Sequence, residues 1–404
     1  NRFQKSTYRD DALYELGNTQ VATNNTNGAI QSFKKLIEEH PKSPFVARSM
    51  LKEGLIYYNT ERDNLALASY KKVVKDFPKS QEAKEAVANA RQLYIDIGKV
   101  DEYAIWVKSL GFVSISDADL DNTTYESAEK PFLSNEFKKA IIGFQKYLNT
   151  FPNGLNIVKA NYYLAQSYIS EKQMNNAIQH LQKVTQSNNE FTETSLTILA
   201  QFYLEKNDWN SAIPVLTSLE EIAASTQNKT FAMSNLMKGF YETNQFVKAA
   251  LYAEKVLALP RIDDRVKSDA TILIARAAFK DGNDTKAKAT FKEVEKISSG
   301  NLKAEALYYS AYYEHKAGNY KVSNEIVQKI AADFSGYKYW GAKSLIVMAK
   351  NFNGLKDAYQ ANYILENVIA NFGEFEEIIQ EAKTLLTEFK IEQSKTNESV
   401  IIGN

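Results

Sequence analysis

The sequence predicts an all-α solenoid of about ten antiparallel helix pairs with a C-terminal capping helix. Ten small residues, nine of them alanine, recur along the chain at intervals of 35 to 38. Twelve positions before eight of them lies another glycine or alanine. A fixed period in this range is typical of stacked helix pairs, because each pair buries its apolar surface only against its neighbours.

The small residues mark the places where two antiparallel helices cross, since close approach requires that neither helix carries a large side chain there. The positions in the second helix of each pair are Ala29, Ala66, Ala104, Ala140, Ala177, Ala212, Ala249, Ala287, Ser323 and Ala361. Those in the first helix are Gly17, Gly54, Ala128, Ala165, Ala200, Ala275, Ala311 and Ala349.

The first two units align without a gap. Residues 8–43 map at an offset of 37 onto residues 45–80, and each unit ends in Pro-Lys-Ser. Proline cannot continue a helix and keeps the preceding residue out of the helical region. The serine that follows is predicted to cap the next helix.

The third unit is degenerate and ends at Gly111, with Gln92 at its small position. Helix is predicted to resume after Ser116, an N-cap residue with an acid three positions on. We therefore predict two sub-arrays, units 1–3 in residues 1–111 and units 4–10 in residues 112–373.

The later units repeat the same signals for turns and helix ends. An apolar or aromatic residue follows the turn, three positions before the small residue, most clearly at Trp209, Phe246 and Tyr320. A final helix over residues 374–393 has one apolar face and one face rich in Glu and Lys, as expected of a cap. Residues 394–404 are predicted to be a flexible tail.

Composition excludes several classes of protein. Lys plus Arg equals Asp plus Glu at 49 each, which argues against nucleic acid as the main partner. Cysteine is absent, so a thiolate nucleophile and a cysteine-ligated zinc are excluded. No apolar run reaches 18 residues, so no transmembrane segment is predicted.

The beginning of the chain points to missing sequence. The chain opens on Asn1 with no signal-peptide pattern, and no polar capping helix precedes the first predicted helix. We expect this chain to continue from upstream repeats, with any targeting or lipidation signal outside it.

Catalytic and metal-binding patterns are absent from the sequence. His40, His180 and His315 lie in different units, and no phosphate-binding glycine loop occurs. Asp117, Asp119 and Asp121 have the spacing that begins a calcium loop, but Asn122 replaces its glycine and Ala128 its bidentate glutamate. The sequence predicts no enzyme, no cofactor and no metal site.

With small residues, aromatics and alanines at recurring places, and a proline at the end of several units, residues 6–373 resemble tetratricopeptide repeats (TPR). This resemblance implies a right-handed superhelix whose concave surface is lined by four positions of each first helix. The candidate binding residues are therefore Tyr14, Asn18, Arg48, Tyr58, Tyr125, Lys159, Tyr162, Gln166, Gln201, Lys238, Tyr241, Arg276, Tyr308, Tyr312, His315 and Lys350. Leu51, Phe132, Phe279 and Lys343 occupy the same positions.

Aromatic residues interleaved with polar and basic ones suit an extended peptide or a partner helix. The alternative is that these positions are solvated helix faces in a tyrosine-rich chain. The Lys–Asn pair by which chaperone-binding TPRs hold a terminal carboxylate is missing, since Asn18 is accompanied by Tyr14.

The Phe-Pro-x-Ser punctuation and the Asn- and Lys-rich composition resemble bacterial envelope TPR proteins of the Bacteroidetes type. Relatives of that type include the lipoprotein of the outer-membrane assembly machine and the Tol-Pal coordinator. The resemblance implies a non-enzymatic scaffold or adaptor in a cell-envelope assembly or secretion complex, periplasmic and outer-membrane associated. The alternatives are a cytoplasmic location, a regulatory or substrate-presenting arm of an enzyme whose catalytic domain lies upstream, and a self-associating structural array.

Overall fold

The structure is a computed structural model that describes the backbone of residues 6–402 and the side chains of residues 6–394. This part of the chain holds 21 helices and no strand, which confirms the all-α prediction. The helices of residues 6–195 are α1 (Arg9–Ala22), α2 (Thr26–Glu39), α3 (Val46–Asn59), α4 (Asp63–Asp76), α5 (Gln81–Asp96), α6 (Val100–Lys108), α7 (Asp117–Leu133), α8 (Phe137–Thr150), α9 (Ile157–Ser170) and α10 (Met174–Val184). After α11 (Thr192–Glu205) come α12 (Trp209–Ile222), α13 (Thr226–Glu242), α14 (Phe246–Leu257), α15 (Asp264–Lys280), α16 (Asp284–Ile297), α17 (Gly300–Lys316), α18 (Tyr320–Asp333), α19 (Lys338–Gly354), α20 (Ala358–Asn371) and α21 (Glu376–Ile402).

Packing divides the chain into two compact units, residues 1–195 and residues 196–404. We call them the N-terminal and the C-terminal unit. The division falls at a different place from the sub-array boundary predicted at residues 111/112, which concerns the repeat pattern and stays a prediction.

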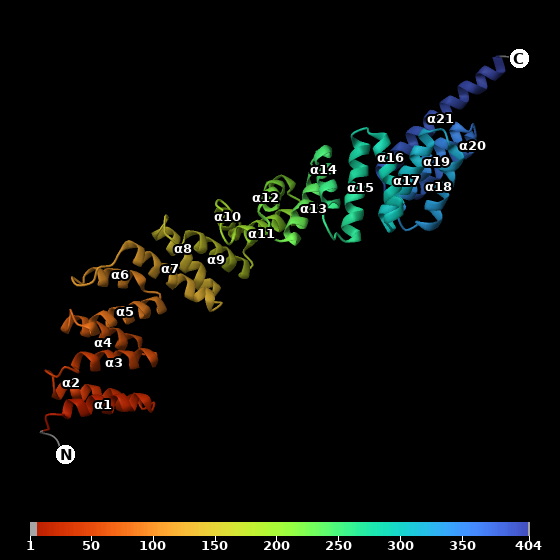
Figure 1. Cartoon of the computed structure of the whole chain (residues 1–404). Helices are drawn as coiled ribbons and strands as arrows, with labels where there is room; N and C mark the ends of the chain where they lie inside the picture. The colour runs from red at the N-terminus through yellow and green to blue at the C-terminus, as the bar shows by residue number, and fades with distance from the viewer. Residues whose placement is uncertain (1–5, 403–404) are drawn as a thin grey trace. The chain divides into compact units, whose positions relative to one another are not determined.

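Helices pack in consecutive antiparallel pairs, such as α1 with α2 and α15 with α16, and second helices also pack against the next first helix, as α4 does α5 and α14 does α15. Figure 1 shows α1 to α5 lying side by side in chain order within the N-terminal unit. First helices also contact one another, as α3 does α5 and α17 does α19. The side chains between successive first helices therefore form one continuous face in each unit, which we call the first-helix face.

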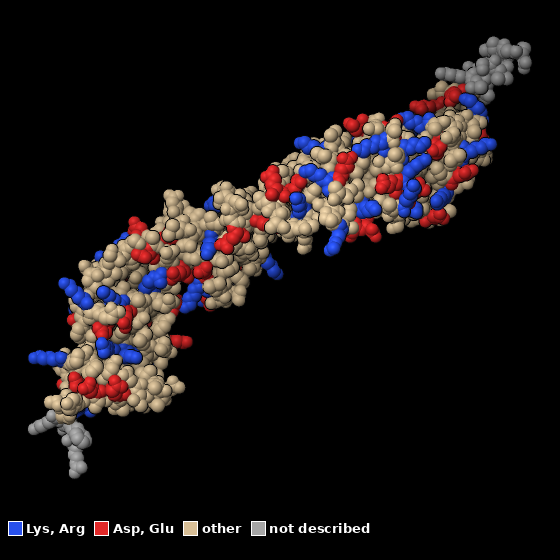
Figure 2. Space-filling view, viewed as in Figure 1, with Lys and Arg blue, Asp and Glu red and all other residues tan. Residues whose placement is uncertain are grey.

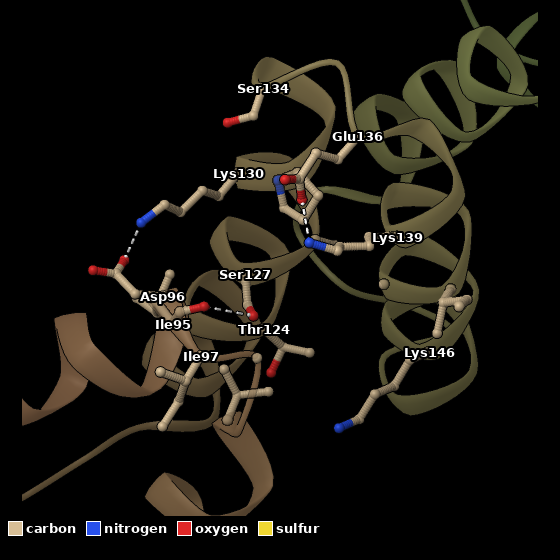
Figure 3. Close-up of a pocket in the computed structure, with 16 residues that line it drawn as sticks. Ile95, Asp96, Ile97, Thr124, Ser127, Lys130, Ser134, Glu136, Lys139 and Lys146 are labelled. Atoms are coloured by element: carbon tan, nitrogen blue, oxygen red, sulfur yellow. Dashed lines mark hydrogen bonds and ion pairs between the residues drawn. The ribbon is translucent and has the colours of Figure 1, made fainter. Parts of the chain in front are cut away.

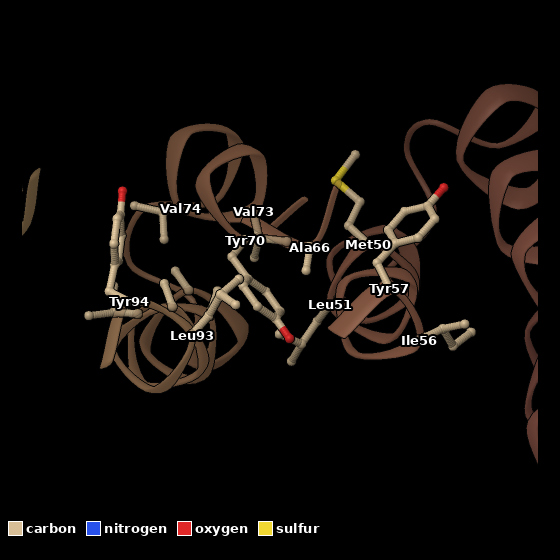
Figure 4. Close-up of a cluster of buried hydrophobic side chains, with 14 of the residues drawn as sticks. Met50, Leu51, Ile56, Tyr57, Ala66, Tyr70, Val73, Val74, Leu93 and Tyr94 are labelled. Carbon is tan, nitrogen blue, oxygen red and sulfur yellow. The ribbon is translucent and has the colours of Figure 1, made fainter. Parts of the chain in front are cut away.

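The predicted small positions lie at the helix crossings. Nine of the ten second-helix positions are completely buried, and Ala104 is partly buried. A Cβ atom added to Gly17 would lie 2.5 Å from the ring of Phe33, and one added to Gly54 would lie 2.6 Å from the ring of Tyr70. Figure 4 shows Tyr70 in this cluster, with Ala66 and Leu51. The small residue of one helix thus makes room for a large aromatic side chain of its partner.

Helix ends follow the predicted chemistry with one exception. Ser80 caps α5 by accepting a hydrogen bond from the amide of Ala83, and Ser116 forms a capping box with Asp119. Ser43 instead accepts from the amide of Phe45, one residue before α3 begins. The turns inside pairs use the left-handed backbone region that asparagine tolerates, as at Asn24, with φ 58°.

The degenerate third unit keeps its helix pair but shortens it. Its second helix, α6, has nine residues, whereas α4 and α8 have fourteen each. Gln92 is exposed, whereas Ala90 on the same helix is completely buried. The pair α5 and α6 packs over a smaller surface than pairs such as α3 with α4 and α7 with α8.

The last helix, α21, covers the end of the C-terminal unit with Ile378, Ala382 and Phe389, which are buried against α19 and α20. It runs to Ile402, so helix extends beyond residue 393, where the predicted capping helix ended. The predicted tail at residues 394–404 falls mainly outside the described side chains. Among the described helices, none combines the length and hydropathy that crossing a bilayer requires.

His180 is a core histidine whose protonation would oppose folding. Its Nδ1 donates to Oδ1 of Asn161 at 2.8 Å, because Nδ2 of the same amide donates to the carbonyl of Ile157. The ring stacks on Tyr168 and is 8% exposed. Burial, together with the nearby charge of Lys183, lowers the pKa of His180 from 6.5 to about 4.

We expect the N-terminal unit to lose stability as the pH falls from about 6.5 to about 4. In this window the unfolded chain binds a proton at position 180 that the folded chain does not. Protonation therefore lowers the free energy of unfolding, by up to about 3 kcal/mol. An NMR titration, with the resonance assigned through His180→Gln, measures the pKa directly. A midpoint at pH 6 or above would contradict the expectation.

Candidate protein-binding surface

The predicted binding residues of the N-terminal unit lie along its first helices, where most already contact the next first helix. The ring of Tyr14 stacks on Phe45 at 4.8 Å between centroids. The hydroxyl of Tyr58 donates to Asp96 at 2.5 Å, and the guanidinium of Arg48 lies 3.0 Å from Glu82. These side chains therefore connect one repeat to the next, and we call such contacts between successive first helices rungs.

The other predicted residues of this unit differ in their exposure. Tyr162 stacks on Phe191 at 4.3 Å, Asn18 and Gln166 are half-buried, and Lys159 is exposed. Tyr125 departs from the prediction, because it is only 5% exposed and packs between Phe144 and Tyr147. Its hydroxyl donates to Glu129, so it belongs to the core and offers no contact surface.

The first-helix face of the C-terminal unit carries a ladder of ion pairs between successive first helices. Lys238 of α13 lies 3.8 Å from Asp269 of α15, and Lys350 of α19 lies 2.8 Å from Glu381 of α21. The guanidinium of Arg276 binds both carboxylate oxygens of Glu305, at 2.7 and 2.5 Å. Burial alone would lower the pKa of Arg276, but the hydrogen bonds and charge of Glu305 outweigh it and raise that pKa.

An aromatic cluster lies on this face and is formed by α15, α17 and α19. Tyr308 contacts Trp340 at 5.4 Å between ring centroids, and Tyr312 contacts Phe279 at 5.8 Å. All four rings are half-buried, and burial raises the pKa of Tyr308. The cluster presents apolar ring surface beside polar edges, which suits the side chains of an extended protein segment.

The sequence analysis missed Trp340 and its neighbour Tyr339. The signal that could have found them is the run Tyr337-Lys338-Tyr339-Trp340, with three aromatic residues among four at the start of a first helix. Of the remaining predicted residues, Gln201 is exposed, and Tyr241 is half-buried against the ring of Phe246 at 5.5 Å.

His315 is tied to a buried polar network. Its Nδ1 lies 2.7 Å from Oδ1 of Asn351, whose Nδ2 donates to Ser323 and Asn324 at 2.8 Å each. The hydroxyl of Ser323 donates to the carbonyl of Ala311. This network explains why serine replaces alanine at one small position, and it places His315 at the edge of the core.

Charge is finely mixed over both units. Figure 2 shows Lys and Arg interspersed with Asp and Glu, with no extended region of one sign on the face in view. On that face the charges form no basic stripe of the kind that follows a nucleic-acid backbone.

A cleft of about 520 Å³ lies in the N-terminal unit between the α5–α6 turn, α7 and α8 (Figure 3). Its lining includes the apolar residues Ile95 and Val100. Each of its three lysines pairs with a carboxylate: Lys130 with Asp96, Lys139 with Glu136 and Lys146 with Asp101. The cleft therefore offers no unpaired lysine.

The three aspartates with calcium-loop spacing stabilise the start of α7 or accept hydrogen bonds within the protein. Asp119 completes the capping box of α7, and Asp117 lies in the first turn of that helix. Asp121 is 4% exposed and accepts hydrogen bonds from the hydroxyl of Tyr147 and the amide of Leu155, both at 2.6 Å. Within the described residues, no group of three His, Asp or Glu side chains is placed to hold a metal ion.

Comparison with known proteins identifies the repeat. The family model described as tetratricopeptide repeat matches residues 11–43, 48–80 and 159–188. No curated protein matches the chain.

Several solved structures are similar. The C-terminal part of a TPR repeat-containing protein from Cytophaga hutchinsonii is 16% identical, with 64% of this chain and 98% of that chain covered and a TM-score of 0.41. A tetratricopeptide repeat protein from Parabacteroides merdae is 15% identical, covering 73% and 96%, with a TM-score of 0.24. Yeast Tom70 is 12% identical, covering 97% of both chains, with a TM-score of 0.35.

Proposed function

The chain carries tetratricopeptide repeats, and on this premise we propose that it is a non-enzymatic scaffold that binds other proteins along the first-helix face of its C-terminal unit. The observation that carries the proposal is the half-buried aromatic cluster of Tyr308, Tyr312, Phe279 and Trp340 on that face. Rigid aromatic side chains bury a large area at a small cost in conformational entropy, and they dominate many protein interfaces.

The ion-pair ladder supports this placement by keeping the face rigid. Arg276–Glu305 joins α15 to α17 and Lys350–Glu381 joins α19 to α21, so the aromatic rings between these two pairs are held in place before any partner arrives. A preorganised surface loses less entropy on binding than a flexible one. We place the scaffold in a bacterial envelope assembly or secretion complex, on the sequence resemblance described above.

The test compares two pairs of tyrosines. Partners are captured with the full chain from cross-linked native cells and identified by mass spectrometry, and their affinity is then measured. Tyr308→Ala with Tyr312→Ala is expected to weaken binding about tenfold or more, because each ring is an anchor in a partly dry surface. His315 is left in place because it bonds the buried Asn351.

The matched control removes Tyr359 and Tyr363, two exposed tyrosines stacked on the second helix α20. We expect this variant to bind like the parent. Equal losses in both variants, or none in either, would contradict the placement of the site. Partners drawn only from the cytoplasm would contradict the envelope role.

A further inference from the structure

Lys343 is a cation on the first-helix face of the C-terminal unit that has no carboxylate partner. Lys238, Arg276 and Lys350 on the same face each lie within 4 Å of an acid on the next first helix. Among the side chains of residues 6–394, no carboxylate lies within that distance of the Lys343 ammonium group. The series of ion pairs between successive first helices is therefore interrupted at Lys343.

Three aromatic rings surround the ammonium group instead. Nζ of Lys343 lies 5.2 Å from the ring centroid of Tyr339, 5.6 Å from that of Tyr308 and 5.9 Å from that of Trp340. Ring faces attract a cation and hold it in position, but they do not neutralise its charge. We call Lys343 with these three rings the Lys343 platform.

The acids whose charges act on Tyr339, one of the rings beside Lys343, are already engaged. Glu305 is bound by both arms of Arg276, Glu377 accepts from the hydroxyl of Tyr339, and Glu381 pairs with Lys350. Drawing any of them to Lys343 would break a hydrogen bond or ion pair that they already make. The charge of Lys343 is thus available to a group from another molecule.

The surroundings restrict which anion fits. A single ammonium group compensates one negative charge, and burial together with the nearby charges of Glu377, Glu305 and Glu381 raises the pKa of the neighbouring Tyr339. A phosphate dianion would bring a second, uncompensated negative charge into these surroundings, which disfavours it and a nucleic-acid backbone. A lone carboxylate matches the one positive charge. The half-buried rings of Tyr308 and Trp340 offer adjoining apolar surface.

We propose that the Lys343 platform binds an internal Asp or Glu side chain of an extended protein segment, with a neighbouring aromatic or aliphatic residue packed on Trp340 and Tyr308. This inference rests on the proposed function and names the partner chemistry of the same face. It requires neither a free C-terminus nor the Lys–Asn pair that the sequence lacks.

The experiment uses the full chain and two pools of synthetic nine-residue peptides, all labelled at the N-terminus and amidated at the C-terminus. One pool has Phe-Asp fixed at its centre and the other Phe-Asn, with random flanking residues. Since every C-terminus is amidated, the two pools differ only in the central side-chain carboxylate. The parent protein is expected to retain the Phe-Asp pool about fivefold better.

Four variants separate the explanations. Lys343→Met and Lys343→Gln are expected to abolish the preference for Asp, whereas Lys343→Arg keeps the charge and should preserve it. Lys329→Met is the matched control, since it removes one positive charge from an exposed site on the second helix α18. Circular dichroism of each variant confirms that the fold is retained.

The outcomes distinguish this inference from the proposed function. If the parent retains both pools equally, and better than the Tyr308→Ala, Tyr312→Ala variant does, the carboxylate inference fails and the proposed function stands. If the preference for Asp survives in Lys343→Met, the inference also fails. If the parent retains neither pool better than the double alanine variant does, the proposed surface itself is contradicted.

Discussion

Replacing Tyr70 with alanine is expected to destabilise the N-terminal unit by about 3–5 kcal/mol, the usual cost of deleting a fully buried aromatic side chain. Tyr70 is completely buried, and its ring fills the space that Gly54 leaves at the crossing of α3 and α4. The loss would leave a cavity beside Leu51 and Leu93 (Figure 4). Hydrogen exchange resolved by peptide, measured across a urea series, reports the change for these helices.

Tyr70→Phe is the matched control because it removes only the hydroxyl. That hydroxyl has no hydrogen-bond partner among the described residues, and burial raises the pKa of Tyr70 to about 12. Removing an unsatisfied buried polar group costs nothing and relieves a desolvation penalty. We therefore expect Tyr70→Phe to be at least as stable as the parent. Similar losses in both variants would show that the hydroxyl, and not the ring volume, matters.

Asp121→Ala is expected to cost about 2–4 kcal/mol, since it leaves one buried and one part-buried donor without an acceptor, at about 1–3 kcal/mol for the buried donor and less for the other. These donors are the hydroxyl of Tyr147 and the amide of Leu155, which Asp121 joins across a repeat boundary. Gly154 belongs to the same packing, because a Cβ there would lie 2.5 Å from the Tyr147 hydroxyl oxygen. Thermal unfolding of the full chain, with hydrogen exchange at α7–α9, measures the effect.

The control for Asp121 is its neighbour Asp119, the exposed acid of the capping box. Asp119→Ala removes a carboxylate from the same helical turn but leaves the contacts of Tyr147 intact. Its effect should be much smaller than that of Asp121→Ala. Equal effects would mean that Asp121 acts only through the helix dipole, and added calcium that stabilised the parent but not Asp121→Ala would contradict its structural role.

The repeat could be predicted from the sequence because every helix crossing has the same packing requirement. At each crossing a small residue must face a large one, so Gly17 and Ala29 are echoed by equivalents along the whole chain. Periodicity also places the first-helix residues on one face. It was wrong at Tyr125, where a predicted surface position packs into the core, whereas the degenerate third unit with the exposed Gln92 was already visible in the sequence.

Contacts between repeats were out of reach because their partners follow no fixed rule. Arg276 finds Glu305 at a separation of 29 residues, whereas Tyr58 finds Asp96 at 38. In the sequence, Asp121 resembles an ordinary acid near the start of a helix. Its role depends on the loop before α9, whose Leu155 amide donates a hydrogen bond to it. Lys343 could be placed on the right face, but its lack of a carboxylate depends on three-dimensional surroundings that the pattern does not encode.

The rungs between first helices tie only adjacent repeats, as in Arg48–Glu82 and Lys350–Glu381. In such an array each repeat is stabilised mainly by its two neighbours. The stability of the chain is therefore a sum over the interfaces between adjacent repeats and does not depend on one central core. Whole pairs can therefore be duplicated, lost or exchanged over evolutionary time with little penalty to distant ones. The number of repeats and the composition of the first-helix face can then diverge independently among descendants.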